Sequence, residues 1–465
     1  MNARVWPVRC RGVSLESFPP GFVWGVATAA YQIEGAVTED GRGPSIWDTF
    51  SHTPGRVALG ETGDVACDHY HRWPEDLDLI RALGAGAYRF SIAWPRIQPA
   101  GSGPVEQRGL DFYRRLLDGM RERGITPFIT LYHWDLPQAL EDEGGWRQRD
   151  TAHRFAEYAG IVADAVAEFS PYWITLNEPQ VSSIVGYAEG RHAPGAREGH
   201  GALAAAHHLL LGHGLAVREL RARGGGSGVG ITLNLSPGVP ATDSAGDADA
   251  ARRHDLLVNR LFTDPVLAGT YPDDAAEVWG GLTDFSFLRD GDLALISQPL
   301  DFLGVNYYRL SHVAAAPVSP SPSPSASDVG VATVRVPGAE YTEMDWPVEP
   351  DGLPVTLAGL RSRFADLPPI YITENGAAFP DEVGPDGEVA DPRRVAFISA
   401  HLDALARAIA DGADVRGYFY WSLLDNFEWA RGYEPRFGLV HVDYATQVRT
   451  PKASYQWLAA HLARP

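Results

Sequence analysis

The sequence predicts a single large (β/α)8 barrel, on three observations. Eight short apolar runs recur along the chain, amphipathic segments separate them, and two of the runs end on a glutamate. Strands that alternate with helices favour parallel pairing, and eight such units close into a barrel. A doubly wound open sheet is the alternative, but no Gly-x-Gly-x-x-Gly motif follows any of the runs.

The expected strands are short stretches rich in β-branched and aromatic residues, bounded by turn residues. They cover residues 22–27, 87–94, 126–133, 172–178, 229–235, 302–308, 370–373 and 415–423. Between them, apolar residues recur at spacings of three and four, which places them on one face of a helix. The clearest examples are Phe155, Tyr158, Val162, Val166 and Phe169, and later Val395, Ile398, Leu402, Leu405 and Ile409.

No linker divides the chain. We expect an N-terminal extension over residues 1–17 and one barrel domain over residues 18–465. Residues 317–327 alternate proline and serine, which predicts an extended, mobile loop after the sixth strand, at the rim of the barrel. The glycine-rich run at 224–228 lacks the Lys-Ser/Thr ending of a phosphate loop and is expected to form a turn.

The charge of the chain argues against some partners, and its cysteines and apolar runs indicate the compartment. The chain of 465 residues carries a formal charge of −20. Nucleic acids and anionic membranes bind clusters of Lys and Arg, so this charge argues against both as partners. Cys10 and Cys67 are too few for a disulfide framework and fit a reducing compartment. No run reaches the roughly 20 apolar residues of a membrane span, and no apolar stretch near the N-terminus is long enough for a signal peptide. We expect a cytoplasmic protein, either a monomer or a homo-oligomer.

Two of the predicted strands end on a glutamate that is followed by a break. Residues 172–179 read Tyr-Trp-Ile-Thr-Leu-Asn-Glu-Pro and end the strand at Glu178, and residues 370–376 read Ile-Tyr-Ile-Thr-Glu-Asn-Gly and carry Glu374. Barrel enzymes place catalytic groups at the C-terminal ends of their strands. Two carboxyl groups in one site indicate hydrolysis of a glycosidic bond by an acid and a nucleophile.

Further polar and aromatic residues gather at the ends of the predicted strands. They are Arg89, His133, Asn177, Asn306, Tyr308 and Trp421. Any one of them could simply cap a strand. As a set from several strands they converge on one pocket, which favours a binding site.

With these motifs the sequence resembles glycoside hydrolase family 1, the retaining β-glucosidase family. The resemblance begins with the stretch from Phe18 to Gly35 and covers essentially the whole chain. It implies that Glu178 is the general acid/base, that Glu374 is the nucleophile, and that no cofactor or metal is needed. The predicted barrel domain is then the catalytic domain of that family.

Each catalytic role requires its own surroundings. The nucleophile must be ionised, and Arg89 and Tyr308 are the expected donors to it, although Arg89 could instead tie strands together. The acid must keep its proton near neutral pH, so Glu178 is expected in a drier place, with its pKa raised by the nucleophile's charge. A retaining mechanism places the two carboxyl groups about 5–5.5 Å apart.

The resemblance also implies the residues that recognise the sugar. They are Gln32, His133, Asn177, Tyr308, Trp421, Glu428 and Trp429, with Arg89, Asn306 and Trp346 in support. Asn177 is expected to bond the 2-hydroxyl, Trp421 to form a floor under the ring, and Glu428 and Trp429 to contact the 3-, 4- and 6-hydroxyls. Trp346 resembles the aromatic residue that stacks on the leaving group, with surface packing as the alternative.

Glu428 bears on the substrate. Relatives that hydrolyse 6-phospho-glycosides typically carry a serine there with a lysine and a tyrosine nearby, and a carboxylate would repel a phosphate. We therefore expect an unphosphorylated substrate: cellobiose, short cello-oligosaccharides or aryl β-glucosides. A 6-phospho-β-glycosidase, a transglycosylase and a non-catalytic sugar-binding relative are the alternatives, and the last would be expected to lack one glutamate. Glucose is not distinguished from galactose or fucose.

One dense group of potential metal ligands lies outside these motifs. It consists of Asp64, Cys67, Asp68, His69 and His71. Its spacing matches no established zinc pattern, so we expect these side chains to pack a loop below the pocket instead.

Overall fold

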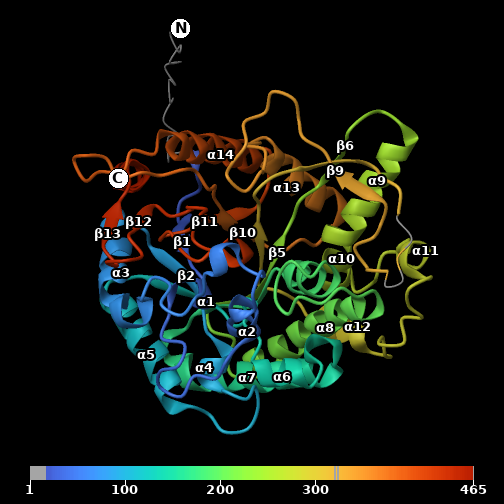
Figure 1. The fold of residues 1–465 in the computed structure, drawn as a ribbon, viewed down its shortest axis with the longest axis horizontal. Coiled ribbons are helices and arrows are strands. Elements are labelled where there is room, and N and C mark those ends of the chain that lie inside the picture. Colours follow the sequence, from blue (N-terminus) through green and yellow to red (C-terminus); the bar gives the residue numbers. More distant parts are fainter. Residues whose placement is uncertain (1–16, 319–320, 322–323, 464–465) are drawn as a thin grey trace.

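A closed barrel of eight parallel strands forms the core of the computed structural model, which describes residues 17–318, 321 and 324–463. The strands neighbour one another in the order β1-β11-β10-β7-β5-β4-β3-β2, and β2 pairs with β1 to close the ring. This confirms the predicted fold class (Figure 1). Residues 1–16 of the expected N-terminal extension lie outside the described residues, so the boundary at residue 18 stays a prediction.

Each predicted strand is present in the barrel. The strands are β1 (Val23–Ala27), β2 (Ala87–Ser91), β3 (Thr126–Thr130), β4 (Tyr172–Asn177), β5 (Gly228–Asn234), β7 (Phe302–Asn306), β10 (Ile370–Asn375) and β11 (Val415–Trp421). Several end earlier than predicted. The second strand stops at Ser91 because a short helix, α4 (Trp94–Ile97), begins with Pro95 in its first turn, where proline costs no hydrogen bond.

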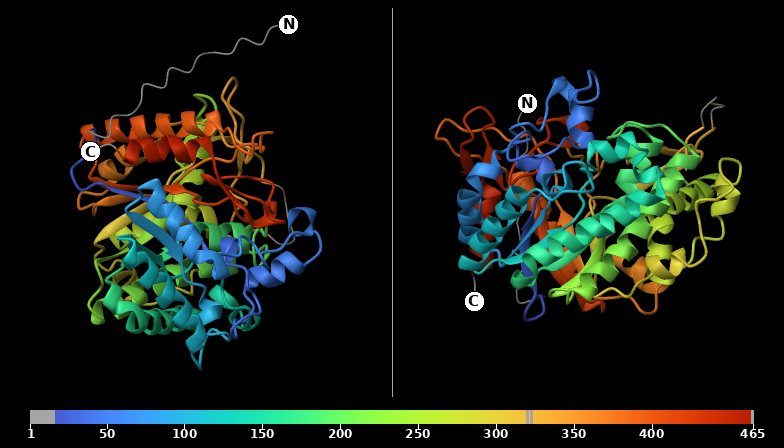
Figure 2. Two further views of the ribbon diagram at one scale, coloured as in Figure 1. Left: turned by 90° about the vertical axis from the view of Figure 1, so that its left-hand side faces the viewer. Right: turned by 90° about the horizontal axis from the view of Figure 1, so that it is seen from below.

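A helical layer surrounds the barrel, as the side views in Figure 2 show. The main helices after successive strands are α3 (His69–Leu83), α5 (Gln107–Glu122), α7 (Arg149–Val166), α8 (His200–Ala222), α13 (Gly352–Arg363), α14 (Pro392–Ala410) and α15 (Ala453–Leu462). After β5, this place is taken by α9 (Ala245–Asp255), α10 (Leu261–Ala268), α11 (Ala275–Trp279) and α12 (Asp292–Ile296). Because α15 contacts both α14 and α3, the last helix packs beside the first of the ring.

Shorter elements are inserted around this frame. They are the helices α1 (Ala30–Ile33), α2 (Ile46–His52) and α6 (Gln138–Asp142), the single helical turns η2 (Ala58–Gly60), η3 (Gly145–Arg147), η4 (Ala167–Phe169) and η7 (Trp429–Arg431), and the π-helices η5 (Val181–Ala188) and η6 (Leu256–Arg260). Two small sheets join β6 (Gly238–Pro240) to β8 (Ser311–Ala315) and β9 (Val331–Thr333), and β12 (Val440–Val442) to β13 (Arg449–Pro451). These insertions supply most of the loops around the site.

Aromatic rings fill one end of the barrel interior. Phe128 and Tyr172 stack with centroids 4.3 Å apart, and Phe128 also contacts Phe302 and Phe419. Gly25 makes room for this layer, since a Cβ there would lie 2.3 Å from the Phe419 ring. The packed layer closes the interior to water, so polar side chains at the opposite strand ends rest on a rigid apolar base.

The proline/serine segment differs in part from its prediction. Residues 319, 320, 322 and 323 lie outside the described residues. Its last residues, however, are packed rather than extended into solvent, because Ser325 donates to the Ala188 carbonyl at 2.6 Å and Ala326 accepts from the Trp279 indole at 2.9 Å. The prediction of a mobile loop is therefore wrong for this end, where hydrogen bonds to two distant segments hold the backbone.

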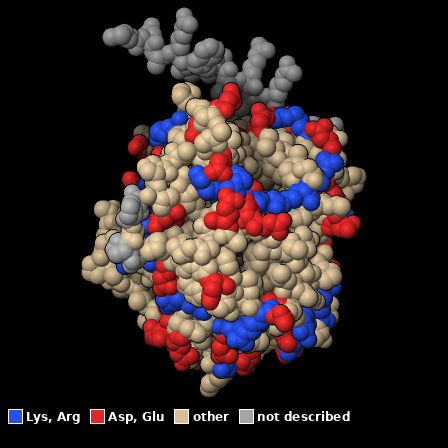
Figure 3. Space-filling view, turned by 90° about the vertical axis from the view of Figure 1, so that its right-hand side faces the viewer, with Lys and Arg blue, Asp and Glu red and all other residues tan. Residues whose placement is uncertain are grey.

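Acidic and basic side chains alternate on the surface. On the face drawn in Figure 3 they lie side by side, without a basic stripe among the described residues. Arg252, for example, contacts both Asp249 and Asp274. No helix in the described part of the chain is long and apolar enough to cross a membrane.

Candidate active site

A cavity of about 620 Å³ opens among the loops that follow the barrel strands. Eight of the predicted site residues line it: His133, Glu178, Tyr308, Trp346, Glu374, Trp421, Glu428 and Trp429. The other four, Gln32, Arg89, Asn177 and Asn306, are fully buried. Arg89 bonds to Glu374, Asn177 to His133 and Asn306 to Glu178. Gln32 donates to the Phe427 carbonyl, next to Glu428. The structure thus brings the whole predicted set together, although its members come from segments far apart in the chain.

Glu374 lies on β10 and receives two donors. Arg89 forms an ion pair with its Oε1, and the Tyr308 hydroxyl donates to its Oε2 at 2.5 Å. The side chain of Arg89 is fully buried and that of Glu374 is only 4% exposed, so water screens their attraction little. Gly376 permits this arrangement, because a Cβ there would lie 1.8 Å from the Trp421 carbonyl oxygen.

Glu178 lies at the end of β4 in different surroundings. Asn306 donates to its Oε1 at 2.6 Å, and the Asn234 side chain also hydrogen-bonds to it. Burial, and then the negative charge of Glu374, raise the pKa of Glu178 well above its ordinary value. Its φ of +47° lies in the left-handed region, which is uncommon for a residue other than glycine and concentrates at functional sites. The barrel therefore holds one carboxyl group among donors and keeps a proton on the other.

Three residues predicted to bind the sugar each keep one buried polar atom without a partner in the described part of the chain. These atoms are Gln32 Oε1, His133 Nδ1 and Glu428 Oε2. Burial of such atoms is costly unless a ligand or water completes their hydrogen bonds. They present two acceptors and one ring nitrogen, a set suited to the hydroxyl groups of a sugar.

The protonation of His133 follows from its contacts. Burial, and then the charge of Arg89, lower the pKa of His133 well below its ordinary value, so the ring is neutral. The Asn177 amide nitrogen lies 3.0 Å from Nε2 and can only donate to it. The proton of the neutral ring is therefore on Nδ1, which makes the unpartnered atom a donor.

Glu428 carries a raised pKa as well. Burial, and then the charge of Glu374, raise the pKa of Glu428 to about 8, while Arg431 acts in the opposite direction. At neutral pH this side chain therefore presents a carboxylic acid that can both donate and accept. The neighbouring Trp429 packs against Trp134 with centroids 4.5 Å apart and against Trp47 at 4.6 Å.

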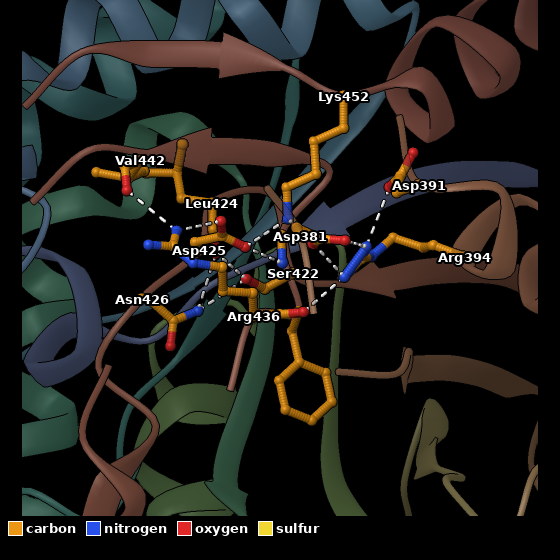
Figure 4. Close-up of polar contacts among 12 residues, drawn as sticks. Asp381, Asp391, Arg394, Ser422, Leu424, Asp425, Asn426, Arg436, Val442 and Lys452 are labelled. Carbon is orange, nitrogen blue, oxygen red and sulfur yellow. Dashed lines mark hydrogen bonds and ion pairs between the residues drawn. The ribbon is translucent and has the colours of Figure 1, made fainter. Parts of the chain in front are cut away.

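A buried ionic network includes Asp425, three residues before Glu428 in the sequence (Figure 4). Lys452 contacts Asp381 at 2.5 Å and Asp425 at 2.7 Å, and Arg436 binds the other oxygen of Asp425 at 2.7 Å. Arg394 joins Asp381 to Asp391, at 2.7 and 3.0 Å. Three acidic and three basic side chains thus balance in charge.

The network is coupled to the loop that carries Glu428 and Trp429 through neighbouring polar side chains. Asn426 donates to the Ser422 hydroxyl at 2.8 Å and accepts from Gln32 at 2.9 Å. Gln32 also donates to the Phe427 carbonyl at 2.9 Å, directly before Glu428. These bonds fix the backbone that presents Glu428 and Trp429.

Sequence reasoning missed several residues of the site. Asn234 lies next to the end of the fifth predicted strand and is the last residue of β5, so the rule that found Asn177 and Asn306 could have found it too. Lys452 and Asp425 gave no such signal, since their pairing depends on contacts between distant segments. Four arginines of the lining also went unpredicted: Arg56, Arg191, Arg309 and Arg431.

The dense group of potential ligands near residue 67 is divided among separate partners. Cys67 donates to the Asp425 carbonyl at 3.0 Å, His69 pairs with Asp76 at 2.8 Å, and His71 lies between Asp68 and Glu39. Among the described residues, no group of three or more His, Cys, Asp or Glu is arranged to hold a metal ion.

The fold and the site are those of an enzyme class built on a (β/α)8 barrel, with two buried carboxyl groups at the ends of strands. The family model described as Glycosyl hydrolase family 1 matches residues 14–464. A bifunctional beta-D-glucosidase/beta-D-fucosidase from Bifidobacterium breve is 50% identical, over 96% of this chain and 99% of its own length. Beta-glucosidase A from Acetivibrio thermocellus is 47% identical, over 95% and 97%.

Solved structures agree with these relatives. The psychrophilic beta-glucosidase from Micrococcus antarcticus superimposes with a TM-score of 0.92 at 50% identity, over 96% of this chain and 97% of its own. The family 1 β-glucosidase from Thermotoga maritima in complex with isofagomine lactam gives 0.90 at 46% identity, over 96% and 98%. The chain belongs to glycosyl hydrolase family 1.

Proposed function

We propose that this protein is a retaining β-glucosidase in which Glu374 is the nucleophile and Glu178 the acid/base. One observation carries the assignment: two carboxyl groups share a cavity but have opposite surroundings. Glu374 accepts from a buried guanidinium and a phenol, which stabilise negative charge, while burial and that charge keep a proton on Glu178. A carboxyl group that keeps its proton beside a second carboxyl group held among donors is the pairing that an acid and a nucleophile require.

The reaction proceeds in two displacements. Glu374 attacks the anomeric carbon as Glu178 gives its proton to the glycosidic oxygen, so the aglycone leaves as an alcohol and a glucosyl ester forms on Glu374. Ester formation removes the charge of Glu374 that raises the pKa of Glu178. Glu178 then takes a proton from water, whose oxygen attacks the anomeric carbon and releases glucose with its configuration retained.

The glucosyl group is proposed to bind at the inner end of the cavity. The unpartnered atoms of Gln32, His133 and Glu428 supply hydrogen bonds to its hydroxyls. The Trp421 ring forms the floor, and the His133 ring lies 5.8 Å away and nearly parallel to it. Trp346 packs against Tyr308 at 5.2 Å, on the wall that an aglycone would contact.

Cellobiose, short cello-oligosaccharides and aryl β-glucosides are the proposed substrates, which would place the enzyme in the degradation of cellulose fragments in the cytoplasm. The relatives are named for glucosidase, fucosidase and 1,4-beta-D-glucan glucohydrolase activities, which supports this class. The presence of both glutamates disfavours a non-catalytic sugar-binding relative. A panel of nitrophenyl glycosides, with and without a 6-phosphate, should give turnover of the unphosphorylated glucoside; preference for the phosphate would favour a 6-phospho-β-glycosidase.

Chemical rescue tests the assignment directly. Replacement of Glu374 by glycine should lower the activity on an activated β-glucoside by several orders of magnitude, and azide should restore turnover with an α-glucosyl azide as product. Glu178→Gly is the matched variant: it should keep slow turnover of substrates with good leaving groups and give a β-azide. An active Glu374→Gly protein without azide, or a β-product from it, would falsify the assignment. Product analysis at high glucoside concentration separates hydrolysis from transglycosylation.

A further inference from the structure

The outer part of the cavity is lined by cations. Four arginines line it: Arg56, Arg191 and Arg309 lie in loops after α2, η5 and β7, and Arg431 ends the helical turn η7. The acidic lining residues are the three glutamates already described, which belong to the inner, sugar-binding end. Positive charge therefore predominates in the lining of the outer part of the cavity, and only Arg191 among these four pairs with a carboxylate in the described part of the chain, that of Glu189.

Arg309 is the best placed of these arginines. It directly follows Tyr308, whose hydroxyl contacts Glu374. The carbon at the centre of its guanidinium lies 5.7 Å from the centroid of the Trp346 ring, on the wall where an aglycone would leave the glucosyl group. A group bound against Trp346 would thus meet both an aromatic face and a guanidinium.

The guanidinium of Arg309 has no ion-pair partner within the described ranges. The nearby carboxylates are engaged elsewhere: Asp345 pairs with Arg335, and Glu349 pairs with His312 at 2.7 Å. Burial, and then the charge of Arg191, lower the pKa of Arg309, while Asp345 and Glu349 act in the opposite direction. A partly buried cation beside a second cation gains from an anionic ligand.

We propose that the outer part of the cavity accepts an aglycone that carries a carboxylate, and in particular an aromatic acid whose ring lies on Trp346 and whose carboxylate pairs with Arg309. The inference rests on the proposed function and names its substrate class. The planar guanidinium matches a carboxylate with two parallel hydrogen bonds. The apolar lining residues Phe50, Val258 and Met344 favour an aromatic body over a second sugar.

The test compares two substrates that differ in one charge. For 4-carboxyphenyl β-D-glucoside and its uncharged methyl ester, kcat/KM is measured in the wild type and in Arg309→Met. Both enzymes are given the same two substrates. The ratio of kcat/KM for the acid to kcat/KM for the ester can therefore be compared between the enzymes, because the intrinsic reactivity of the two leaving groups is the same in both. We expect Arg309→Met to lower that ratio at least about tenfold, the value of a hydrogen bond to a charged group. Added salt should lower the wild-type ratio as well.

Controls separate this inference from the proposed function. Arg154→Met removes a cation from α7, where Arg154 pairs with Asp150, and should leave the ratio unchanged. Arg191→Met should lower it in the same direction as Arg309→Met. An equal ratio in wild type and Arg309→Met, or an equal loss of kcat/KM for cellobiose, would overturn the inference while the glucosidase assignment stands. Failure of the wild type to hydrolyse either aryl glucoside would instead remove the assignment itself.

Discussion

Arg89 joins Glu374 to Asn177 through two nitrogens of one guanidinium. One nitrogen contacts the Glu374 carboxylate, and the other donates to Asn177 Oδ1 at 2.6 Å. Asn306 donates to the same amide oxygen at 3.1 Å, so this oxygen is fully occupied. The Asn177 amide nitrogen donates one hydrogen to His133 Nε2 at 3.0 Å, so its second hydrogen is the one that the predicted bond to the 2-hydroxyl would use.

Arg89→Lys is expected to lower kcat on 4-nitrophenyl β-glucoside by about 10² to 10³-fold. Lysine keeps the positive charge, but a single ammonium cannot reproduce two fixed contacts, and each hydrogen bond to a charged group contributes about 1.5–3 kcal/mol. Steady-state kinetics check the size of the loss, and near-UV circular dichroism checks that the variant is folded. Retention of more than a tenth of the wild-type kcat would show that Arg89 only ties strands together.

The pH profile should report the raised pKa of Glu178. Because the acid must be protonated to act, kcat/KM should fall as the pH rises through that pKa. Glu428 also has a raised pKa, about 8, so Glu428→Gln is the matched variant. Glu428→Gln should bind substrate more weakly but keep the alkaline limb of the pH profile. Glu178→Gln should lose that limb for substrates with good leaving groups. Loss of the alkaline limb in Glu428→Gln would show that Glu428, and not Glu178, is the group that titrates.

Neutralising Glu374 should lower the pKa of Glu178. The charge of Glu374 raises the pKa of Glu178, so its removal lowers that pKa. Trapping the enzyme with a 2-fluoro-glucoside esterifies Glu374 without a substitution. A carboxyl titration followed by carbon NMR should show the Glu178 pKa lowered in the trapped enzyme, and an unchanged titration would contradict the electrostatic coupling.

The barrel and its catalytic pair could be predicted because their signals are local. A strand is a short apolar run, and Glu178 and Glu374 stand where such runs end. Arg309 was not predicted, since one position beyond Tyr308 the strand pattern stops and a loop sets the direction of the side chain. The pairing of Lys452 with Asp381 and Asp425 joins segments 71 and 27 residues away in sequence. No spacing rule reports contacts of that kind.

Lys452→Met should lower the free energy of unfolding by about 3–5 kcal/mol, because it leaves Asp381 and Asp425 buried with one cation fewer. Urea unfolding measures the loss. Lys452 is also the only lysine in the sequence and is fully buried, so amine acylation of the native protein should spare it. Mass spectrometry after labelling tests this, with urea-unfolded protein as the control. Rapid acylation in the native state would show that the network opens.

Asp135 lies two residues after His133 in the sequence. Its side chain is buried, and neither carboxyl oxygen has a hydrogen-bond partner within the described part of the chain. Burial raises the pKa of Asp135 to about 8, against the attraction of Arg42. The folded protein therefore holds a proton that the unfolded chain, with an ordinary aspartate pKa of about 4, releases.

Between about pH 4 and 8 the folded state binds more protons, so this group makes the free energy of unfolding fall as the pH rises. The slope from one such proton is at most about 1.4 kcal/mol per pH unit. Asp135→Asn removes the proton uptake, and urea unfolding at several pH values should show a shallower decline than in the wild type. Glu178 and Glu428 titrate in both proteins, so the difference between the two curves isolates Asp135. Parallel curves would mean that Asp135 is ionised in the folded protein and has a partner that stabilises its charge.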